Sequence, residues 1–290
     1  MKYGYFPGCS AEATGKAYDI STRAVCAKLG IELEELDDWN CCGATSYFSA
    51  RELLSFAITA RNLSIAEAMG HTDLVTSCNA CFEGLDKTNR YLAESPDLAE
   101  KVGRALAQVG RKYDGTVTVR HIADVLVNDY GLEAIAQRVT RRLTGIKVAS
   151  YYGCQYSRPV GSFDDCEFPV TMDRLFEAMG ATAVDFPGKA KCCGGMMMMT
   201  QMDAALKMCH DILRDAADGE ADVIVCACPL CEMNLEAYQP KVNAKYGTSF
   251  RIPVMHFTQL AGFAVGCDPK DLAIDKQIVP CDAVLAAVPA

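Results

Sequence analysis

The sequence lacks the features that mark several common classes of protein. No apolar run in its 290 residues reaches the roughly 18 residues that a membrane-spanning helix needs. The polar N-terminal stretch "MKYGYFPGCS" does not read as a signal peptide. The net charge of −9 disfavours nucleic acid as the main partner. We therefore expect a soluble, cytoplasmic chain that binds no nucleic acid and reaches a membrane only through partners.

The residue present in excess is cysteine. The chain contains 16 cysteines, too many for a reduced cytoplasmic protein unless they serve a purpose. A disulfide framework needs an oxidising compartment and usually serves small domains. Neither condition fits a chain of 290 residues without a signal peptide. Metal binding or redox chemistry is therefore the better interpretation.

Ten of the cysteines form one spacing pattern that occurs twice, and the second copy follows the first by 145 to 151 residues. Each copy has a single cysteine, an adjacent pair followed by glycine, and a Cys-x-x-Cys motif. The first copy comprises Cys9, Cys41, Cys42, Cys78 and Cys81, and the second comprises Cys154, Cys192, Cys193, Cys228 and Cys231. The flanks match as well, since "TDLVTSCNAC" corresponds to "ADVIVCACPLC". The chain therefore contains an internal repeat of two copies.

Short β-prone segments alternate with helical patterns in each copy, and the cysteine motifs follow predicted strands. This alternation predicts an α/β fold of two similar repeats, each with a largely parallel sheet flanked by helices, related by pseudo-two-fold symmetry. We place the first repeat at residues 1–145 and the second, with a C-terminal tail, at 146–290. The cysteine loops should converge at the carboxyl ends of the strands. Residues 91–113 should be helical.

The stretch "KCCGGMMMMT" raises the question of why two cysteines should be adjacent. Neighbouring side chains of extended backbone point to opposite faces, so Cys192 and Cys193 do not easily serve one tetrahedral ion. Five thiolates per repeat suit an extended cluster of several irons, or four ligands and one free thiol. A zinc site needs only four ligands, and a redox dithiol would leave the repeat unexplained. The glycine after each pair would let the backbone approach an inorganic core.

The double pattern resembles the CCG-domain (cysteine-rich domain) family, and in particular its members of the type of the heterodisulfide reductase B subunit, from Met1 to about Gly266. The resemblance implies that each five-cysteine set holds one noncubane [4Fe-4S] cluster, so that all ten repeat cysteines bind metal. The segments "GGMMMM" and "PLCEMNLEAYQ" depart from the archaeal pattern. The chain looks more like bacterial relatives that act in sulfur metabolism.

The resemblance further implies an oxidoreductase that reduces or forms disulfides, or related sulfur compounds, at the two clusters as part of a larger complex. The sequence lacks a nucleotide-binding fingerprint and the closely spaced cysteines that hold cubane clusters. We therefore expect two partners. One is a ferredoxin-like iron–sulfur relay protein (the C-type component of such a complex) with cubane [4Fe-4S] clusters, and the other is a flavoprotein (the A-type component) with FAD.

Two alternatives remain open. The first is an electron-transfer or anchor subunit of a succinate dehydrogenase or fumarate reductase complex, since relatives with the same motif serve there. The second is a zinc-stabilised assembly protein without redox function. Metal analysis separates the zinc protein from the other two.

His121 and His256 occupy equivalent places, each between a short strand and an apolar helix. We predict both as catalytic residues that supply a proton to a leaving thiolate. A lone histidine is more often structural, and the repetition is what favours a role. A disulfide that takes one electron from each cluster must lie between them, across a cleft. Gly194 to Met197 and Pro229 to Glu232 should line this cleft.

The remaining features of the sequence have simpler interpretations. Met196 to Met199 either line a pocket for a sulfur substrate or pack in the core. The acidic run from Glu32 to Asp38 is a solvated face or a docking surface for a basic partner. Six cysteines lie outside the repeat, and we expect them to be structural: Cys26, Cys166, Cys209, Cys226, Cys267 and Cys281.

Overall fold

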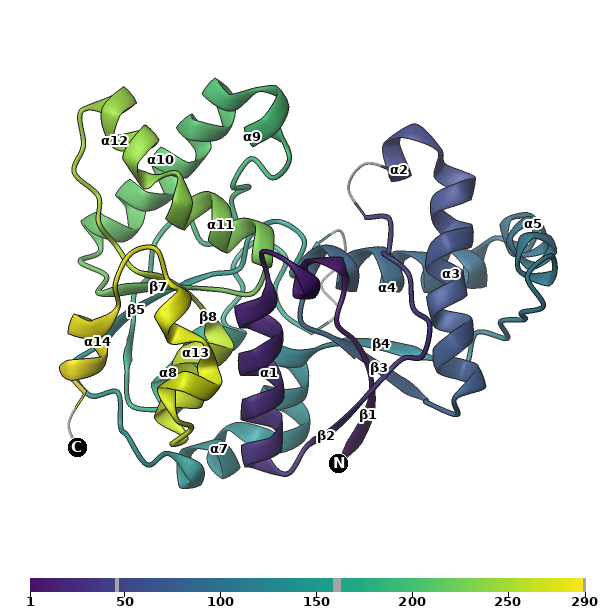
Figure 1. Cartoon of the computed structure of the whole chain (residues 1–290), viewed down its shortest axis with the longest axis horizontal. Coiled ribbons are helices and arrows are strands. Elements are labelled where there is room, and N and C mark those ends of the chain that lie inside the picture. Colours follow the sequence, from purple (N-terminus) through teal and green to yellow (C-terminus); the bar gives the residue numbers. More distant parts are fainter. Residues whose placement is uncertain (45–46, 159–162, 289–290) are drawn as a thin grey trace.

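The computed structural model of the protein describes residues 1–44, 47–158 and 163–288 (Figure 1). It contains two four-stranded sheets, with strand orders β2-β1-β3-β4 and β6-β5-β7-β8. Every strand pair in both sheets is parallel. The two sheets have the same topology and are flanked by helices, so the predicted α/β fold of two similar repeats is confirmed.

The first sheet is built from the N-terminal half of the chain. In chain order its elements are β1 (Lys2–Phe6), η1 (Cys9–Glu12), α1 (Lys16–Leu29), β2 (Glu32–Glu35), α2 (Tyr47–Ala50), α3 (Glu52–Ala68), β3 (Asp73–Thr76), α4 (Asn79–Glu94), α5 (Pro96–Ala107), β4 (Thr118–His121), α6 (Ile122–Asp124), the π-helical η2 (Val125–Gly131) and α7 (Leu132–Arg138).

The C-terminal half builds the second sheet in a similar order. Its elements are β5 (Lys147–Tyr151), α8 (Thr171–Ala178), β6 (Thr182–Ala183), α9 (Met197–Thr200), α10 (Met202–Asp218), β7 (Val223–Cys226), α11 (Pro229–Ala237), α12 (Gln239–Tyr246), β8 (Val254–His256), α13 (Phe257–Ala264), η3 (Pro269–Leu272), η4 (Ile274–Lys276) and α14 (Asp282–Ala286). Within the described ranges, no helix is both long and apolar enough to span a bilayer.

The two halves share their packing. Helices α1 and α13 lie side by side between the sheets (Figure 1), and the hydroxyls of Ser21 and Thr258 are 2.6 Å apart. One apolar core contains Ile122 from the first half together with Leu175 and Leu260 from the second. Because the halves bury one core jointly, the boundary at residue 145 separates two repeats of sequence, and its status as a domain boundary stays a prediction.

The segment from Tyr91 to Tyr113 is divided between two helices. Helix α4 ends at Glu94 and α5 begins at Pro96. Proline lacks an N–H group and disfavours helical backbone in the residue before it. Ser95 is accordingly extended, and its side chain caps α5 by accepting the amide of Leu98 at 3.4 Å. The helical spacing of the apolar residues therefore did not reveal the break.

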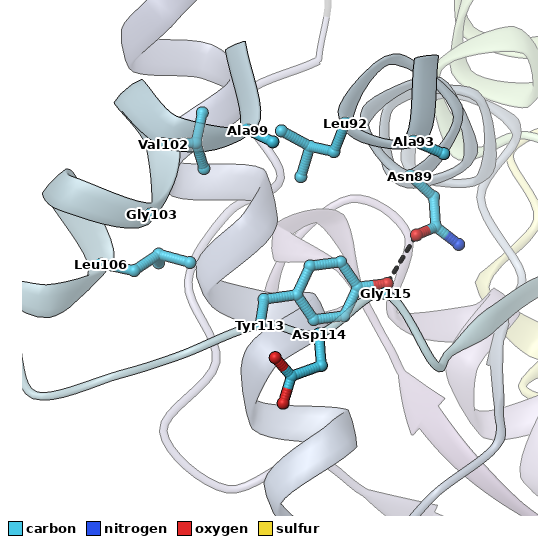
Figure 2. Close-up of a pocket in the computed structure, with 10 residues that line it drawn as sticks. All are labelled: Asn89, Leu92, Ala93, Ala99, Val102, Gly103, Leu106, Tyr113, Asp114 and Gly115. Atoms are coloured by element: carbon cyan, nitrogen blue, oxygen red, sulfur yellow. Dashed lines mark hydrogen bonds between the residues drawn. The ribbon is translucent and has the colours of Figure 1, made fainter. Parts of the chain in front are cut away.

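Helices α4 and α5 border a cavity of about 240 Å³ (Figure 2). The Tyr113 hydroxyl donates a hydrogen bond to Asn89 Oδ1 at 2.5 Å within it. The lining residues are Asn89, Leu92, Ala93, Ala99, Val102, Gly103, Leu106, Tyr113, Asp114 and Gly115. None of the ten repeat cysteines is among them, so this cavity is separate from the cysteine site.

Candidate functional site

The cysteine motifs lie just beyond the ends of strands. Strand β1 ends three residues before Cys9, and β3 ends two residues before Cys78. In the second half, β5 ends three residues before Cys154 and β7 two residues before Cys228. Since the strands of each sheet are parallel, these loops lie at the carboxyl edge, where α/β proteins bind their ligands.

The first five cysteines form a series of sulfur contacts. Cys41 Sγ lies 3.4 Å from Cys9 Sγ, and Cys42 Sγ lies 3.4 Å from Cys81 Sγ. Cys81 also hydrogen-bonds with Cys78. The adjacent pair thus reaches two different partners, as the alternation of neighbouring side chains predicts.

The second five repeat this arrangement position by position. Cys193 Sγ lies 3.6 Å from Cys231 Sγ, and Cys192 hydrogen-bonds with Cys154. Cys231 in turn hydrogen-bonds with Cys228. The sulfur contacts therefore follow the same scheme in both halves.

The two sets meet where the halves meet. The thiols of Cys78 and Cys228 interact across the boundary, since each shifts the pKa of the other. Beside them, Asn79 Nδ2 donates to the carbonyl of Tyr152 in the other half at 2.7 Å. The two sets therefore face one another through the Cys-x-x-Cys motifs.

In the Cys-Cys-Gly turns, backbone amides donate hydrogen bonds to cysteine sulfur atoms. Gly194 N donates to Cys192 Sγ and Gly195 N to Cys193 Sγ, both at 3.4 Å. A backbone amide acts in the same way on Cys41 in the first half. Such bonds stabilise thiolates and tune the potential of an iron–sulfur group.

Three thiols favour the thiolate form, Cys41 and Cys78 in the first half and Cys192 in the second. Hydrogen bonds from Cys42 and Cys9 hold the pKa of Cys41 far below its ordinary value. A hydrogen bond from Cys154 lowers the pKa of Cys192 to about 6. The thiolate is the metal-binding form of cysteine, so each set contains at least one thiol that favours this form.

Glycines keep the backbone close to the sulfur atoms. Gly8 and Gly153 have left-handed φ angles of 78° and 70°. A Cβ on Gly8 would lie 2.9 Å from Cys81 Sγ, and one on Gly153 would lie 3.2 Å from Cys231 Sγ. Five thiols with amide donors and so close a backbone fit a multinuclear iron–sulfur group. Among the described residues, no three or more histidine, cysteine, aspartate or glutamate side chains form a site for one metal ion.

The glycine after each cysteine pair also has a packing reason. Gly43 and Gly194 both have left-handed φ angles, 71° and 86°. A Cβ on Gly194 would lie 2.8 Å from the Cβ of Ala205 in α10. Glycine is therefore required by the turn and by the neighbouring helix.

The sequence analysis missed the side chains that hydrogen-bond to the backbone carbonyls of the adjacent cysteine pairs. Thr59 Oγ1 donates to the carbonyl of Cys42 at 2.7 Å, and Cys209 Sγ donates to the carbonyl of Cys193 at 3.3 Å. Asn234 Nδ2 donates to the same carbonyl of Cys193 at 3.3 Å. Thr59 and Cys209 are 150 residues apart, which is the spacing of the repeat. Aligning the two copies could have found them.

His121 lies at the boundary of the halves. Its Nδ1 caps helix α6, and its Nε2 lies 3.1 Å from the carbonyl of Ser77. The backbone of Ala227 also hydrogen-bonds with the ring, and burial lowers the pKa of His121 to about 4. The neutral imidazole thus ties together the residues that directly precede Cys78 and Cys228.

His256 has a different environment. Its ring stacks on Tyr18, with centroids 4.3 Å apart and planes 2° from parallel. Its Nε2 lies 4.0 Å from Glu232 Oε2. Burial lowers the pKa of His256 to about 3, whereas burial, and then repulsion by Glu236, raises the pKa of Glu232 to about 9. Both partners are therefore neutral at pH 7, and the contact is not an ion pair.

The segments predicted to line a cleft occupy several environments. Met198 is buried in the core, while Met196 and Met199 are 50% and 76% exposed. Pro229 lies at the boundary of the halves, since a Cβ on Gly15 would meet it at 2.9 Å. The methionine run is therefore part core and part surface, and the cleft stays a prediction.

An open groove of about 520 Å³ borders the first cysteine set. Its lining is Cys9, Glu12, Glu35, Leu36, Asp37, Asp38, Trp39, Asn40 and Cys41. The Asp38 carboxylate pairs with Arg61, and Trp39 donates to Glu35 at 3.0 Å. The exposed end of the acidic run therefore lies directly beside two thiols.

The cysteines outside the repeat are mostly interior. Cys166 is half-buried, and the other five are buried. Burial raises the pKa of Cys226 well above its ordinary value. These thiols pack as small apolar side chains.

Comparison with known families matches both copies of the pattern. The family model of the cysteine-rich domain (CCG) matches residues 3–86 and 148–236. These two segments contain all ten repeat cysteines. The predicted family resemblance is confirmed.

Several relatives match nearly the whole chain. The B subunit of the ferredoxin/F(420)H(2)-dependent CoB-CoM heterodisulfide reductase of Methanosarcina acetivorans is 32% identical, over 96% of this chain and 94% of the relative. A protein of Archaeoglobus profundus named for its likeness to the heterodisulfide reductase B subunit is 31% identical, over 94% and 93%. The membrane anchor subunit of the 8-methylmenaquinol:fumarate reductase of Wolinella succinogenes is 31% identical, over 96% and 97%. The predicted affinity to bacterial sulfur metabolism stays a prediction.

A solved structure has the same fold. The crystal structure of a hypothetical protein from Helicobacter pylori matches with a TM-score of 0.79 at 15% identity, over 96% of this chain and 52% of that chain. Together with the family match and the relatives, the paired cysteine sets lead to one conclusion: the chain belongs to the cysteine-rich CCG domain family and is related over nearly its whole length to the B subunit of heterodisulfide reductase.

Proposed function

We propose that the protein is the iron–sulfur catalytic subunit of a heterodisulfide-reductase-type complex, an oxidoreductase that reduces or forms disulfides or related sulfur compounds. The observation that carries this proposal is the meeting of two five-cysteine sets at Cys78 and Cys228. Relatives named as heterodisulfide reductase subunits support it.

Each set would hold one noncubane [4Fe-4S] cluster. Cys9, Cys41, Cys42, Cys78 and Cys81 would bind the first, and Cys154, Cys192, Cys193, Cys228 and Cys231 the second. When bound, the two clusters supply one electron each to the two sulfurs of a disulfide. Sulfur–sulfur contacts of 3.4 to 3.6 Å within the halves support a multinuclear group over a single ion.

The chain's own residues set the surroundings of this reaction. Cys78 and Cys228 are buried at the boundary, whereas Cys9, Cys41 and Cys192 are exposed. A disulfide bound near Cys78 and Cys228 would be shielded from water, which strengthens electrostatic interactions there. The exposed thiols support the approach of a relay subunit that delivers electrons. FAD and cubane [4Fe-4S] clusters would belong to the flavoprotein and relay partners.

We propose His256 and His121 as catalytic proton sources. His256 would pass on the proton that the neutral Glu232 carboxyl holds, since its Nε2 faces Glu232 Oε2 at 4.0 Å. His121 has backbone partners for its ring, including Ser77, so positioning of the Cys-x-x-Cys loops is a second role that its geometry supports. Replacing both histidines should slow turnover while the iron content stays unchanged.

Anaerobic purification tests the proposed function. Two four-iron clusters correspond to about eight irons and about eight acid-labile sulfides per chain. The protein should then reduce a disulfide when supplied with its relay and flavoprotein partners. Stoichiometric zinc with little iron would exclude this function and favour the zinc-stabilised assembly protein.

A second candidate is an electron-transfer or anchor subunit of a fumarate reductase or succinate dehydrogenase complex. The observation that favours it is the 31% identity to the fumarate reductase membrane anchor subunit of Wolinella succinogenes. Anaerobic co-purification from the native organism separates the two candidates. Recovery of a succinate-oxidising or fumarate-reducing flavoprotein, with no disulfide reductase activity, would favour this second role.

A further inference from the structure

Tyr18 places a buried hydroxyl at the boundary between the halves. The residue is the third of helix α1 and is only 1% exposed. Its hydroxyl has no hydrogen-bond partner among the described residues. Buried polar atoms are nearly always paired, so an unpaired hydroxyl at this place points to a bound group that accepts its hydrogen.

The position of the ring is fixed from both halves. Tyr18 comes from the first half but stacks on His256 of the second at 4.3 Å, and it meets Phe257 edge-on at 6.0 Å. One helical turn further, Ser21 and Thr258 hydrogen-bond at 2.6 Å and hold α1 against α13. The hydroxyl is therefore held in place by packing on either side.

Tyr18 lies beside a loop where the two sets meet. Its amide donates to the carbonyl of Gly15 at 3.0 Å, and a Cβ on Gly15 would lie 2.9 Å from Pro229, the residue after Cys228. Burial raises the pKa of Tyr18 well above its ordinary value, and the charges of Cys78 and Cys228 raise it further. These are the two thiols that interact across the boundary. The protonated hydroxyl can therefore donate a hydrogen bond to an anionic neighbour.

The ring stacked on the other histidine has no hydroxyl. The ring that lies parallel to His121 is Phe163, with centroids 6.2 Å apart and planes 8° from parallel. Phenylalanine has no hydroxyl. Each half thus stacks an aromatic ring on the histidine of the other, and of these two stacked rings only that of Tyr18 carries a hydroxyl. Tyr156 also meets His121, but edge-on, with centroids 5.0 Å apart.

We propose that the Tyr18 hydroxyl donates a hydrogen bond to an anionic sulfur at the meeting point of the two cysteine sets, and so makes the two halves of the site unequal. This inference rests on the proposed function. The anionic sulfur has two sources, the iron–sulfur group with its thiolates or the sulfur substrate. The two sources are separated by measuring with and without substrate.

Tyr18→Phe tests this inference, because it removes the oxygen and keeps the ring that stacks on His256. The matched control is Tyr156→Phe. Tyr156 is fully buried and its hydroxyl is also unpartnered, but the charges that raise its pKa after burial include carboxylates and no cysteine. Iron, sulfide and thermal unfolding of the wild type and both variants come first, followed by anaerobic redox titration monitored by electron paramagnetic resonance.

The expected result is full iron in Tyr18→Phe with a more negative reduction potential for one iron–sulfur centre, since hydrogen bonds to sulfur raise the potential. That outcome without substrate assigns the bond to the iron–sulfur group. Unchanged potentials with about fivefold or more weaker binding of the CoB–CoM heterodisulfide assign it to the substrate. Tyr156→Phe should change neither quantity.

Unchanged potentials and unchanged heterodisulfide binding in fully loaded Tyr18→Phe would overturn the inference. An equal effect of Tyr156→Phe would overturn it too, because the effect would then follow from any lost buried hydroxyl. A wild type without iron refutes the proposed function instead, so the two failures are distinguishable.

Discussion

The two cysteine sets have matching sulfur contacts and different surroundings. The distance from Cys42 to Cys81 is 3.4 Å, and the equivalent distance from Cys193 to Cys231 is 3.6 Å. The loop before Cys41 carries Asp37 and Asp38, whereas the loop before Cys192 carries Lys189 and Lys191. The two halves therefore have the same arrangement of cysteine sulfurs, but the charged side chains around these sulfurs differ.

This charge difference has a redox consequence. Lys189 forms a buried ion pair with Asp173 at 2.5 Å, and Lys191 pairs with Asp215 at 2.9 Å. On the other side, acidic groups line the groove beside Cys9 and Cys41. Negative charge near a cluster disfavours an added electron, so two clusters with equal ligands are expected to have unequal potentials.

The largest effect should come from removing one ligand in either half. We expect Cys42→Ser and Cys193→Ser each to lose or alter the iron of its own half, about half of the total, because each set has its own five thiols. Iron analysis and electron paramagnetic resonance of both variants check this. The loss of all iron from either variant would contradict two separate sets and indicate that the ten cysteines bind as one unit.

The two histidines should contribute equally to the pH dependence of stability. Burial lowers the pKa of His121 to about 4 and of His256 to about 3, from an ordinary value of 6.5. Below pH 6.5 the unfolded chain therefore binds protons that the folded chain does not. Stability should be full above pH 6.5 and should fall as the pH decreases, by on the order of 2 kcal/mol per histidine at pH 5.

Anaerobic urea unfolding at pH 7 and pH 5 measures this dependence. The two histidines together cause part of the loss of unfolding free energy between pH 7 and pH 5. His121→Gln and His256→Gln should each remove about half of that part, because both folded pKa values lie below the measured pH range. A variant that keeps the whole dependence would show that its histidine is already protonated in the fold.

The smallest effect should come from the side chains that hydrogen-bond to the backbone carbonyls of the adjacent cysteine pairs. Thr59→Val should cost about 1 kcal/mol, because it removes the hydroxyl that donates to the carbonyl of Cys42. Cys209→Val should cost less, since a thiol is a weak donor and Asn234 also donates to the carbonyl of Cys193. Free energies of unfolding compare the two variants. A larger loss in Cys209→Val would mean that Asn234 does not substitute for the thiol.

The sequence by itself determined the repeat, the order of strands and helices, and the ten cysteines that come together. Each of these rests on a local signal, such as the β-branched run before Cys78 or the spacing of a Cys-x-x-Cys motif. The same signals place His121 and His256 at the ends of β4 and β8. The break between α4 and α5 also had a local signal, in Ser95 and Pro96.

Only the tertiary structure decided how the two halves face each other. The contact between Cys78 and Cys228, the hydrogen bond from Asn79 to Tyr152 and the stacking of Tyr18 on His256 each join residues of different halves. A repeat specifies two similar units, but the way these units pack depends on the shapes of both surfaces at once. That packing brought the two cysteine sets together and stacked Tyr18 on His256 but Phe163 on His121.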